Sequence, residues 1–202
     1  MKNIFVTAIG TDSGKTIVSA ILCEALDACY WKPVQAGYPR DTDTVTDLVS
    51  NKSFKVFPER YLLQTPASPH AAAKIDNVNI RVGDFKIPGN ELTIVEGAGG
   101  CLVPLNDDEF VIDLAEHLDC EIVLVSNLYL GSINHTLLTL ELLKSRDLPV
   151  KGIIFNGAPN PESERIILHH AHLPVLLRIA QEPLMDRERV SHYATEYLKN
   201  WR

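Results

Sequence analysis

The chain has 202 residues, of which 46% are hydrophobic and 22% are charged, a composition typical of a globular protein. Its formal net charge of −7 argues against a nucleic-acid partner, because no basic stripe is available to replace the counterions of a phosphate backbone. No apolar run is long enough to span a bilayer, and the N-terminus lacks a signal-peptide cleavage site. We therefore expect a cytoplasmic protein that contacts neither membrane nor nucleic acid.

Apolar runs alternate with amphipathic ones along the chain, which is the pattern of alternating strands and helices. In chain order, the predicted elements are a strand at 2–9, a helix at 16–28, strands at 29–35 and 92–96, a helix at 110–118, a strand at 121–126, a helix at 132–146, a strand at 150–155, a helix at 162–172, a strand at 174–179 and a helix at 183–202. The last helix is expected to carry Pro183 in its first turn. The four cysteines form no CxxC pair and are expected to be free thiols in the core.

This alternation predicts an α/β fold formed by one domain over residues 1–202. Strands joined by helical crossovers pair in parallel, and near-continuous apolar strands indicate that helices cover both faces of the sheet. We therefore predict a doubly wound, mostly parallel sheet. Such sheets bind ligands beyond the carboxyl ends of their strands, so polar clusters that follow different strands should gather at one edge.

The stretch TAIGTDSGKT, residues 7–16, joins the first strand to the first helix. It resembles a phosphate-binding loop, although only three residues separate Gly10 from Gly14, where the common pattern has four. The backbone amides at the start of the helix have no internal partners and suit an anion. Lys15 would reach the β- and γ-phosphates, and the Thr16 hydroxyl would coordinate Mg²⁺.

Carboxylates for a magnesium ion occur in two places. Glu96 ends the apolar run LTIVE and is followed by a glycine-rich turn, so it could face the phosphates. The stretch RDTDTVTDLVS offers Asp41, Asp43 and Asp47, although such a cluster is more often a helix start or a solvated loop. Spacing alone does not choose among these three aspartates.

Lys32 ends a short strand and is followed by Pro33, which keeps the lysine backbone extended. A lysine at this edge could neutralise charge on a transferring phosphoryl group. A solvated surface lysine is the alternative, and the two interpretations are about equally supported by the sequence.

Six segments in one order resemble the dethiobiotin synthetase family: TAIGTDSGKT, WKPVQAG, PASPH at 66–70, VEGAGG at 95–100, LGSINHTLLT at 130–139 and FNGA at 155–158. The resemblance extends from residue 3 to about residue 185. It implies a P-loop NTPase-like fold with a variant phosphate loop in which the Gly-Lys-Thr end binds the phosphates. It also implies an ATP- and Mg²⁺-dependent ligase acting in biotin biosynthesis on 7,8-diaminononanoate and CO₂.

The resemblance assigns residues by their positions in these segments. It implies ATP contacts from Asp12, Ser13, Gly14, Lys15, Thr16, Ile17, Asp43, Glu96, Gly97, Ala98, Gly99, Asn156 and Gly157. It implies catalytic roles for Thr11, Lys15 and Lys32, a magnesium set of Thr16, Asp43 and Glu96, and substrate contacts from Asp12, Lys32, Ala36, Ser132, Ile133 and Asn134. In the family, the segment at 132–134 comes from the neighbouring subunit, which implies a homodimer with active sites at the interface.

The sequence departs from the family at several positions. Ala36 stands where a serine or threonine is usual, and Asp12 where a glutamate is usual. Segment 76–90 is short for the family's helical crossover and is expected to be mostly loop. The base-contact region reads RIAQEP, where the family usually has an Ile-Pro pair.

Two other functions were weighed. A related amidoligase would usually need a glutaminase domain, for which 202 residues leave no room. A partitioning or positioning ATPase of the same fold would carry a signature lysine five residues before Lys15, where this chain has Gly10. A dethiobiotin synthetase would hydrolyse ATP only with diaminononanoate and CO₂, whereas a partitioning or positioning ATPase would depend on DNA or lipid.

Overall fold

The computed structural model describes residues 2–200. The elements in chain order are β1 (Ile4–Ala8), α1 (Lys15–Leu26), β2 (Cys29–Trp31), β3 (Val34–Ala36), α2 (Asp41–Leu48), β4 (Val56–Phe57), β5 (Tyr61–Leu63), α3 (Pro69–Ile75), the 3-10 turn η1 (Val82–Asp84), β6 (Thr93–Glu96), α4 (Val111–His117), β7 (Glu121–Asn127), α5 (Ser132–Ser145), β8 (Val150–Asn156), α6 (Pro161–Ala171), β9 (Val175–Ile179) and α7 (Arg187–Asn200).

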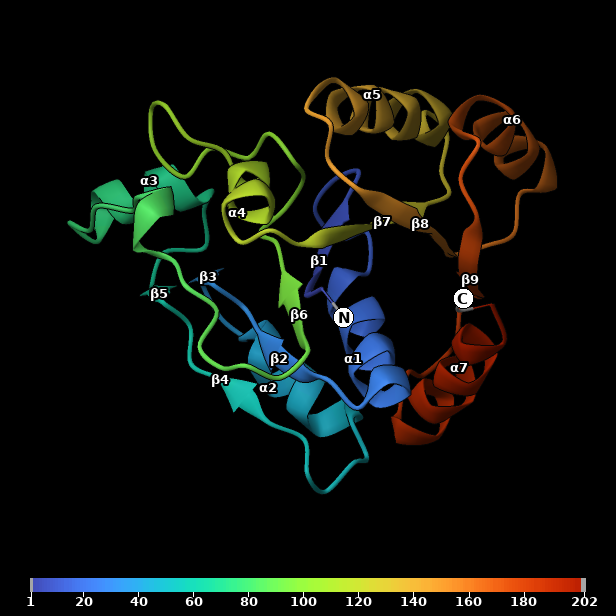
Figure 1. The fold of residues 1–202 in the computed structure, drawn as a ribbon, viewed down its shortest axis with the longest axis horizontal. Coiled ribbons are helices and arrows are strands. Elements are labelled where there is room, and N and C mark those ends of the chain that lie inside the picture. Colours follow the sequence, from blue (N-terminus) through green and yellow to red (C-terminus); the bar gives the residue numbers. More distant parts are fainter. Residues whose placement is uncertain (1, 201–202) are drawn as a thin grey trace.

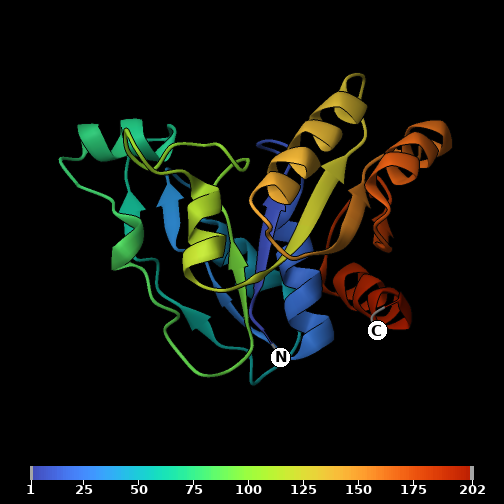
Figure 2. The same ribbon diagram turned by 45° about the horizontal axis from the view of Figure 1, so that its top comes forward.

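The main sheet has the strand order β4-β2-β6-β1-β7-β8-β9, and each neighbouring pair is parallel. β2, β4 and β6 lie on one side of the central β1, and β7, β8 and β9 lie on the other. β3 and β5 form a separate parallel pair. The chain therefore winds in both directions from β1, and the carboxyl ends of the strands in the main sheet meet at one edge (Figure 2).

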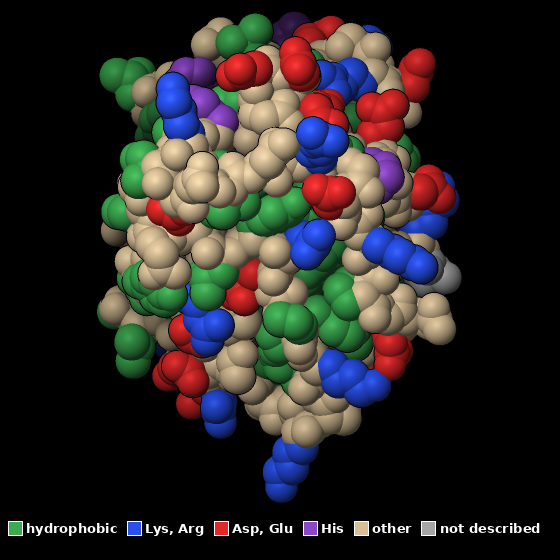
Figure 3. All heavy atoms as spheres, turned by 90° about the vertical axis from the view of Figure 1, so that its left-hand side faces the viewer, with side chains coloured by type: hydrophobic (Ala, Val, Ile, Leu, Met, Phe, Trp, Pro, Cys, Tyr) green, Lys and Arg blue, Asp and Glu red, His purple; other side chains and the backbone are tan. Residues whose placement is uncertain are grey.

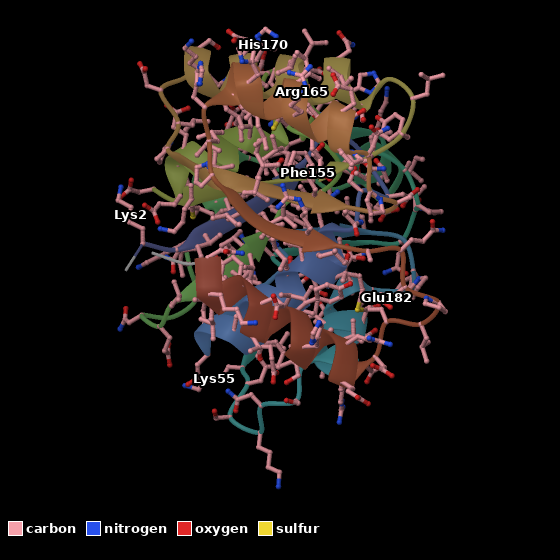
Figure 4. The ribbon with its side chains drawn as sticks, turned by 90° about the vertical axis from the view of Figure 1, so that its right-hand side faces the viewer. Lys2, Lys55, Phe155, Arg165, His170 and Glu182 are labelled. Carbon is pink, nitrogen blue, oxygen red and sulfur yellow. The ribbon has the colours of Figure 1, made fainter. Side chains whose placement is uncertain are left out.

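Helices cover both faces of this sheet (Figure 1). α1, α2 and α7 lie on one face, where their apolar side chains share a buried cluster with β1, β2 and β6. α4 and α5 lie on the other face, and α6 packs beside α5. On that side Phe155 of β8 points inward and is buried, whereas Arg165 and His170 of α6 point away from the sheet (Figure 4). Burial of both sheet faces explains why the strands read as continuous apolar runs.

The surface over β4, β5 and α3 carries interspersed acidic and basic side chains with scattered hydrophobic ones (Figure 3). This face has no broad basic patch, as the acidic composition predicts. Across residues 2–200, every helix is too short or too polar to cross a bilayer. The four cysteines are buried free thiols, as predicted from their spacing.

The predicted fold class is confirmed, and the bounds of α4, β7, α5, β8, α6 and β9 fall close to their predicted ranges. The prediction of a strand at 29–35 is wrong in one respect, since β2 and β3 belong to different sheets. Pro33 separates them, because it has no N–H to continue a ladder. Segment 76–90 is mostly loop as expected, apart from η1.

The final helix begins at Arg187, so Pro183 lies before it and not in its first turn. Its predicted end at residue 202 lies outside the described residues. α2, β4, β5 and α3 are not among the predicted elements. These elements have two to eight residues each, too few for apolar periodicity to stand out.

We predict that Gly152→Ala lowers the free energy of unfolding by about 1–3 kcal/mol, because an added methyl would overpack the β8–β9 contact. A Cβ at this position would lie 2.6 Å from the Pro174 carbonyl oxygen and 2.7 Å from Leu176 Cγ. Urea unfolding would measure the change. Gly83→Ala is the control, since no atom lies within 4 Å of its Cβ. Equal midpoints for both variants would contradict this packing argument.

Candidate active site

A tight turn joins β1 to α1 and is held together by its own side chains. Gly14, the N-cap of α1, has a φ of 93°, a conformation that favours glycine. A Cβ there would lie 2.2 Å from Asn156 Nδ2, which donates a 2.9 Å hydrogen bond to the Ser13 carbonyl oxygen. Ser13 Oγ and Lys15 Nζ both donate to the Gly10 carbonyl oxygen, at 3.1 and 3.3 Å. The turn is thus closed before any ligand binds.

The amino end of α1 is open to an anion. Within the described chain, no side chain caps its first amides, and its first turn contains no acidic residue. The unpaired amides and the helix dipole therefore present positive charge at the carboxyl end of β1. Burial and then the nearby Lys32 ammonium lower the pKa of Lys15 to about 8. The negative charge of a bound polyphosphate would oppose both effects and raise this pKa.

Lys32 lies at the centre of a buried charged cluster at the same edge. Its Nζ lies 2.6 Å from Asp41 Oδ2, 2.9 Å from Glu96 Oε1 and 3.1 Å from the Gly97 carbonyl oxygen. These three acceptors match the three protons of an ammonium group. Burial alone would lower the pKa of Lys32, but Glu96 and Asp41 together raise it above its ordinary value. Lys32 is therefore a buried cation, and the interpretation as a solvated surface lysine is wrong.

Glu96 accepts hydrogen bonds from three side chains, one on α1, one on β2 and one directly after β2. Thr16 Oγ1 donates to Oε1 at 3.1 Å, and Lys32 also contacts Oε1. Tyr30 OH donates to Oε2 at 2.9 Å. The Glu96 side chain is fully buried. Burial and then the charge of Glu96 raise the pKa of Tyr30 well above its ordinary value, so the phenol stays a donor.

Asp41, and not Asp43, joins this cluster. Asp43 is paired with Arg40, and its side chain is 54% exposed. α2 begins at Asp41, whose backbone N–H donates to Gln35 Oε1 at 3.1 Å. Two residues on a helix differ by about 200° around the axis, so Asp43 faces away when Asp41 faces Lys32. In this structure Asp43 lies outside the cluster and does not line the pocket, so its assignment to the ATP and magnesium sites stays a prediction, and Asp41 is the aspartate that the geometry favours.

The turn and the charged cluster face one pocket of about 780 Å³. The predicted site residues that line it are Thr11, Asp12, Gly14, Lys15, Thr16, Ile17, Lys32, Ala36, Glu96, Ala98 and Gly99. Ser13, Gly97 and Asn156 do not line the pocket. The Gly97 carbonyl oxygen accepts from the lining residue Lys32, and Asn156 donates to the carbonyl oxygen of Ser13, which precedes the lining residue Gly14. The scattered segments thus meet at one sheet edge, as the topology requires.

Ser132, Ile133 and Asn134 begin α5 and do not line this pocket. Ser132 is buried with an unpartnered Oγ among the described residues, whereas Ile133 and Asn134 are exposed. Gly157 follows β8 with a φ of 104° and also lies outside the lining. Within a single chain, the residues of the β1–α1 turn therefore meet the carboxylates of the charged cluster, but residues 132–134 lie apart from them.

Several residues of the site are not among the predicted site residues. The PASPH segment lines the pocket through residues 66–69, and Gln35 lines it and anchors α2. Tyr30 was read only as a strand residue. The alternation of Tyr30, Trp31 and Lys32 was the available signal, because residues two apart in a strand share a face.

Comparison with solved structures supports the fold. The MinD cell division ATPase of Pyrococcus furiosus aligns with a TM-score of 0.57 and 16% identity, covering 98% of this chain and 99% of the other. A ParA family ATPase of Chlorobium tepidum aligns with a TM-score of 0.56 and 16% identity, covering 96% and 99%. At this identity the likeness concerns the P-loop NTPase fold alone.

Comparison of sequences identifies the family. A family model described as an AAA domain matches residues 2–189. The ATP-dependent dethiobiotin synthetase of Cytophaga hutchinsonii is 53% identical over 205 residues, covering 100% of this chain and 99% of the relative. That of Christiangramia forsetii is 48% identical over 201 residues, covering 98% and 97%. With identities this high over nearly the whole length, the chain belongs to the dethiobiotin synthetase family.

Proposed function

We propose that this enzyme forms the ureido ring of dethiobiotin from 7,8-diaminononanoate and CO₂, with conversion of ATP to ADP and phosphate. One observation carries the proposal: the open amino end of α1 and the Lys32–Asp41–Glu96 cluster face the same pocket. The family relatives are named ATP-dependent dethiobiotin synthetases, which supports the same conclusion. A cytoplasmic location follows from the use of ATP.

In this proposal the turn binds the triphosphate. The amides at Gly14–Thr16 donate to phosphate oxygens, and Lys15 contacts the β- and γ-phosphates. Ile17, Ala98 and Gly99 line the same side of the pocket and complete the nucleotide contacts. Asn156 and Gly157, at the carboxyl end of β8, are proposed to lie next to the base.

The oxygen donors of the cluster fit a magnesium ion, which prefers hard oxygen ligands. Thr16 Oγ1 lies 3.1 Å from Glu96 Oε1, and Glu96 and Asp41 already share one cation, the Lys32 ammonium. We propose that Thr16, Asp41 and Glu96 would hold the ion. When bound, it would neutralise phosphate charge during phosphoryl transfer.

The chemistry needs no protein nucleophile. One substrate amine captures CO₂ as a carbamate, whose oxygen attacks the γ-phosphorus and displaces ADP. The second amine then attacks the carbonyl carbon of the carbamic-phosphoric anhydride, which closes the urea and expels phosphate. The protein supplies position and charge. Lys32 would stabilise the carbamate and the transferring group, and Thr11 would contact that group.

The remaining pocket residues are proposed to hold the diamine. Asp12 lies at the exposed rim with a φ of 56°, where its carboxylate can meet a substrate amine. Ala36 lines the wall and offers only a methyl group. The substrate carboxylate would bind at the start of α5, since a helix amino end suits an anion.

We propose that this α5 segment serves the neighbouring subunit of a homodimer. Ser132, Ile133 and Asn134 lie outside the pocket of their own chain. Close by, Leu130 is fully exposed and Leu138 is 62% exposed. Burial of such apolar side chains against a second copy would complete each site with residues from its partner.

The function predicts that ATP hydrolysis requires both diaminononanoate and CO₂ and produces dethiobiotin stoichiometrically. Product would be measured by mass spectrometry and phosphate by a coupled assay. DNA and anionic lipid vesicles are the controls and should leave the rate unchanged. Hydrolysis stimulated by DNA or vesicles, without product from the diamine, would contradict the proposal.

The revised carboxylate assignment predicts different outcomes for two neighbouring substitutions. Asp41→Asn removes a carboxylate that contacts Lys32 and should weaken the apparent Mg²⁺ affinity at least about tenfold. Asp43→Asn changes an exposed side chain that is paired with Arg40. The apparent Mg²⁺ affinity of this variant should stay within about twofold of wild type. Turnover measured against Mg²⁺ concentration tests both. A larger loss of Mg²⁺ affinity in Asp43→Asn than in Asp41→Asn would favour Asp43 as the magnesium ligand.

Shared sites predict rescue between two inactive variants. Lys15→Gln disables the phosphate turn, and Asn134→Asp places a negative charge where the substrate carboxylate would bind. A mixed dimer regains one intact site, so an equal mixture should recover about a quarter of wild-type turnover. Exchange of subunits would be verified with differently tagged chains. Mixed dimers without activity would contradict a contribution from the neighbouring subunit.

A further inference from the structure

The two carboxylate oxygens of Glu96 have different surroundings. Oε1 lies toward the pocket, where Thr16 Oγ1 and Lys32 Nζ contact it at 3.1 and 2.9 Å. Oε2 accepts a 2.9 Å hydrogen bond from Tyr30 OH. Glu96 is 1% exposed and Tyr30 is 0% exposed. One oxygen is therefore available to the site, while the other is fixed within the core.

Strand pairing explains how Tyr30 reaches this oxygen. Tyr30 of β2 pairs with Ile94 of β6, two residues before Glu96. Tyr30 and Lys32 share one face of the chain because they are two residues apart. Trp31, between them, packs in the opposite cluster beside Phe85. The same register thus directs a phenol and an ammonium toward one carboxylate.

The tyrosine itself is held rigidly. Its ring belongs to the buried cluster formed by α1, α2, α7 and the sheet, and it is among the largest fully buried side chains. A tyrosine has few rotatable bonds, and close packing removes its freedom to follow a moving partner. Its hydroxyl is therefore a fixed donor for the carboxylate.

We propose that Tyr30 is a positioning residue that holds Oε2 of Glu96 in the core, so that Oε1 is presented to the metal. This inference rests on the proposed function, in which Glu96 is a magnesium ligand. Partners that hydrogen-bond a ligating carboxylate fix its orientation, and their loss typically weakens metal binding about 10–100-fold. Without the phenol, Oε2 loses its donor and the carboxylate can rotate away from Thr16.

The test measures metal binding directly, with Mn²⁺ as the probe and a non-hydrolysable ATP analogue present. Tyr30→Phe removes only the hydroxyl, and Tyr30→Met removes the donor while a flexible side chain fills the gap. Tyr197→Phe is the matched control, because Tyr197 is equally buried in the same cluster but lies on α7, outside the pocket. Electron paramagnetic resonance would report free Mn²⁺, and melting curves would report folding.

We expect both Tyr30 variants to bind Mn²⁺ about tenfold or more weakly, and Tyr197→Phe to bind as wild type. Unchanged Mn²⁺ affinity in a folded Tyr30 variant would overturn the inference, and so would equal weakening in Tyr197→Phe. A wild-type enzyme that binds no Mn²⁺ with nucleotide would instead overturn the proposed metal site.

Discussion

The site depends on one buried carboxylate. Glu96 ends β6 next to β1, and its two oxygens accept from Thr16 at the start of α1 and from Tyr30 and Lys32 at the end of β2. Loss of one partner from a buried ion pair typically costs about 3–5 kcal/mol, because the remaining charge is uncompensated. Through these contacts Glu96 fixes Lys32 relative to the turn between β1 and α1, and Lys32 in turn contacts Asp41 at the start of α2.

The contacts of Glu96 also explain how the fold prepares the site for its chemistry. The parallel strands carry these residues to one edge, where Lys32 and Glu96 are buried while they line the pocket. A lysine and two carboxylates that would be solvated at a surface become a fixed arrangement of charge. Such preorganised charge suits the phosphoryl transfer from ATP to a carbamate that we propose, in which positioning and electrostatic stabilisation would supply the catalysis.

Much of the fold and part of the candidate site could be predicted from the sequence. Strong apolar runs predicted the sheet, and glycines followed by Lys15 and Thr16 predicted the phosphate turn. Local patterns could not show that Pro33 divides β2 from β3, or that Gln35 anchors α2 so that Asp41 faces Lys32. Those outcomes depend on contacts between distant segments. Alternation along the strand could place Tyr30 and Lys32 on one face, but the contact of Tyr30 with Glu96 depends on the pairing of β2 with β6, which local patterns do not show.

The most direct test is a crystal structure of the enzyme with Mg²⁺ and a non-hydrolysable ATP analogue. The account predicts the triphosphate against the amides of Gly14–Thr16, with the metal bound to Thr16 and Glu96 and with Tyr30 still bonded to the same carboxylate. A triphosphate bound elsewhere, with that turn empty and Glu96 directed away from the metal, would contradict it.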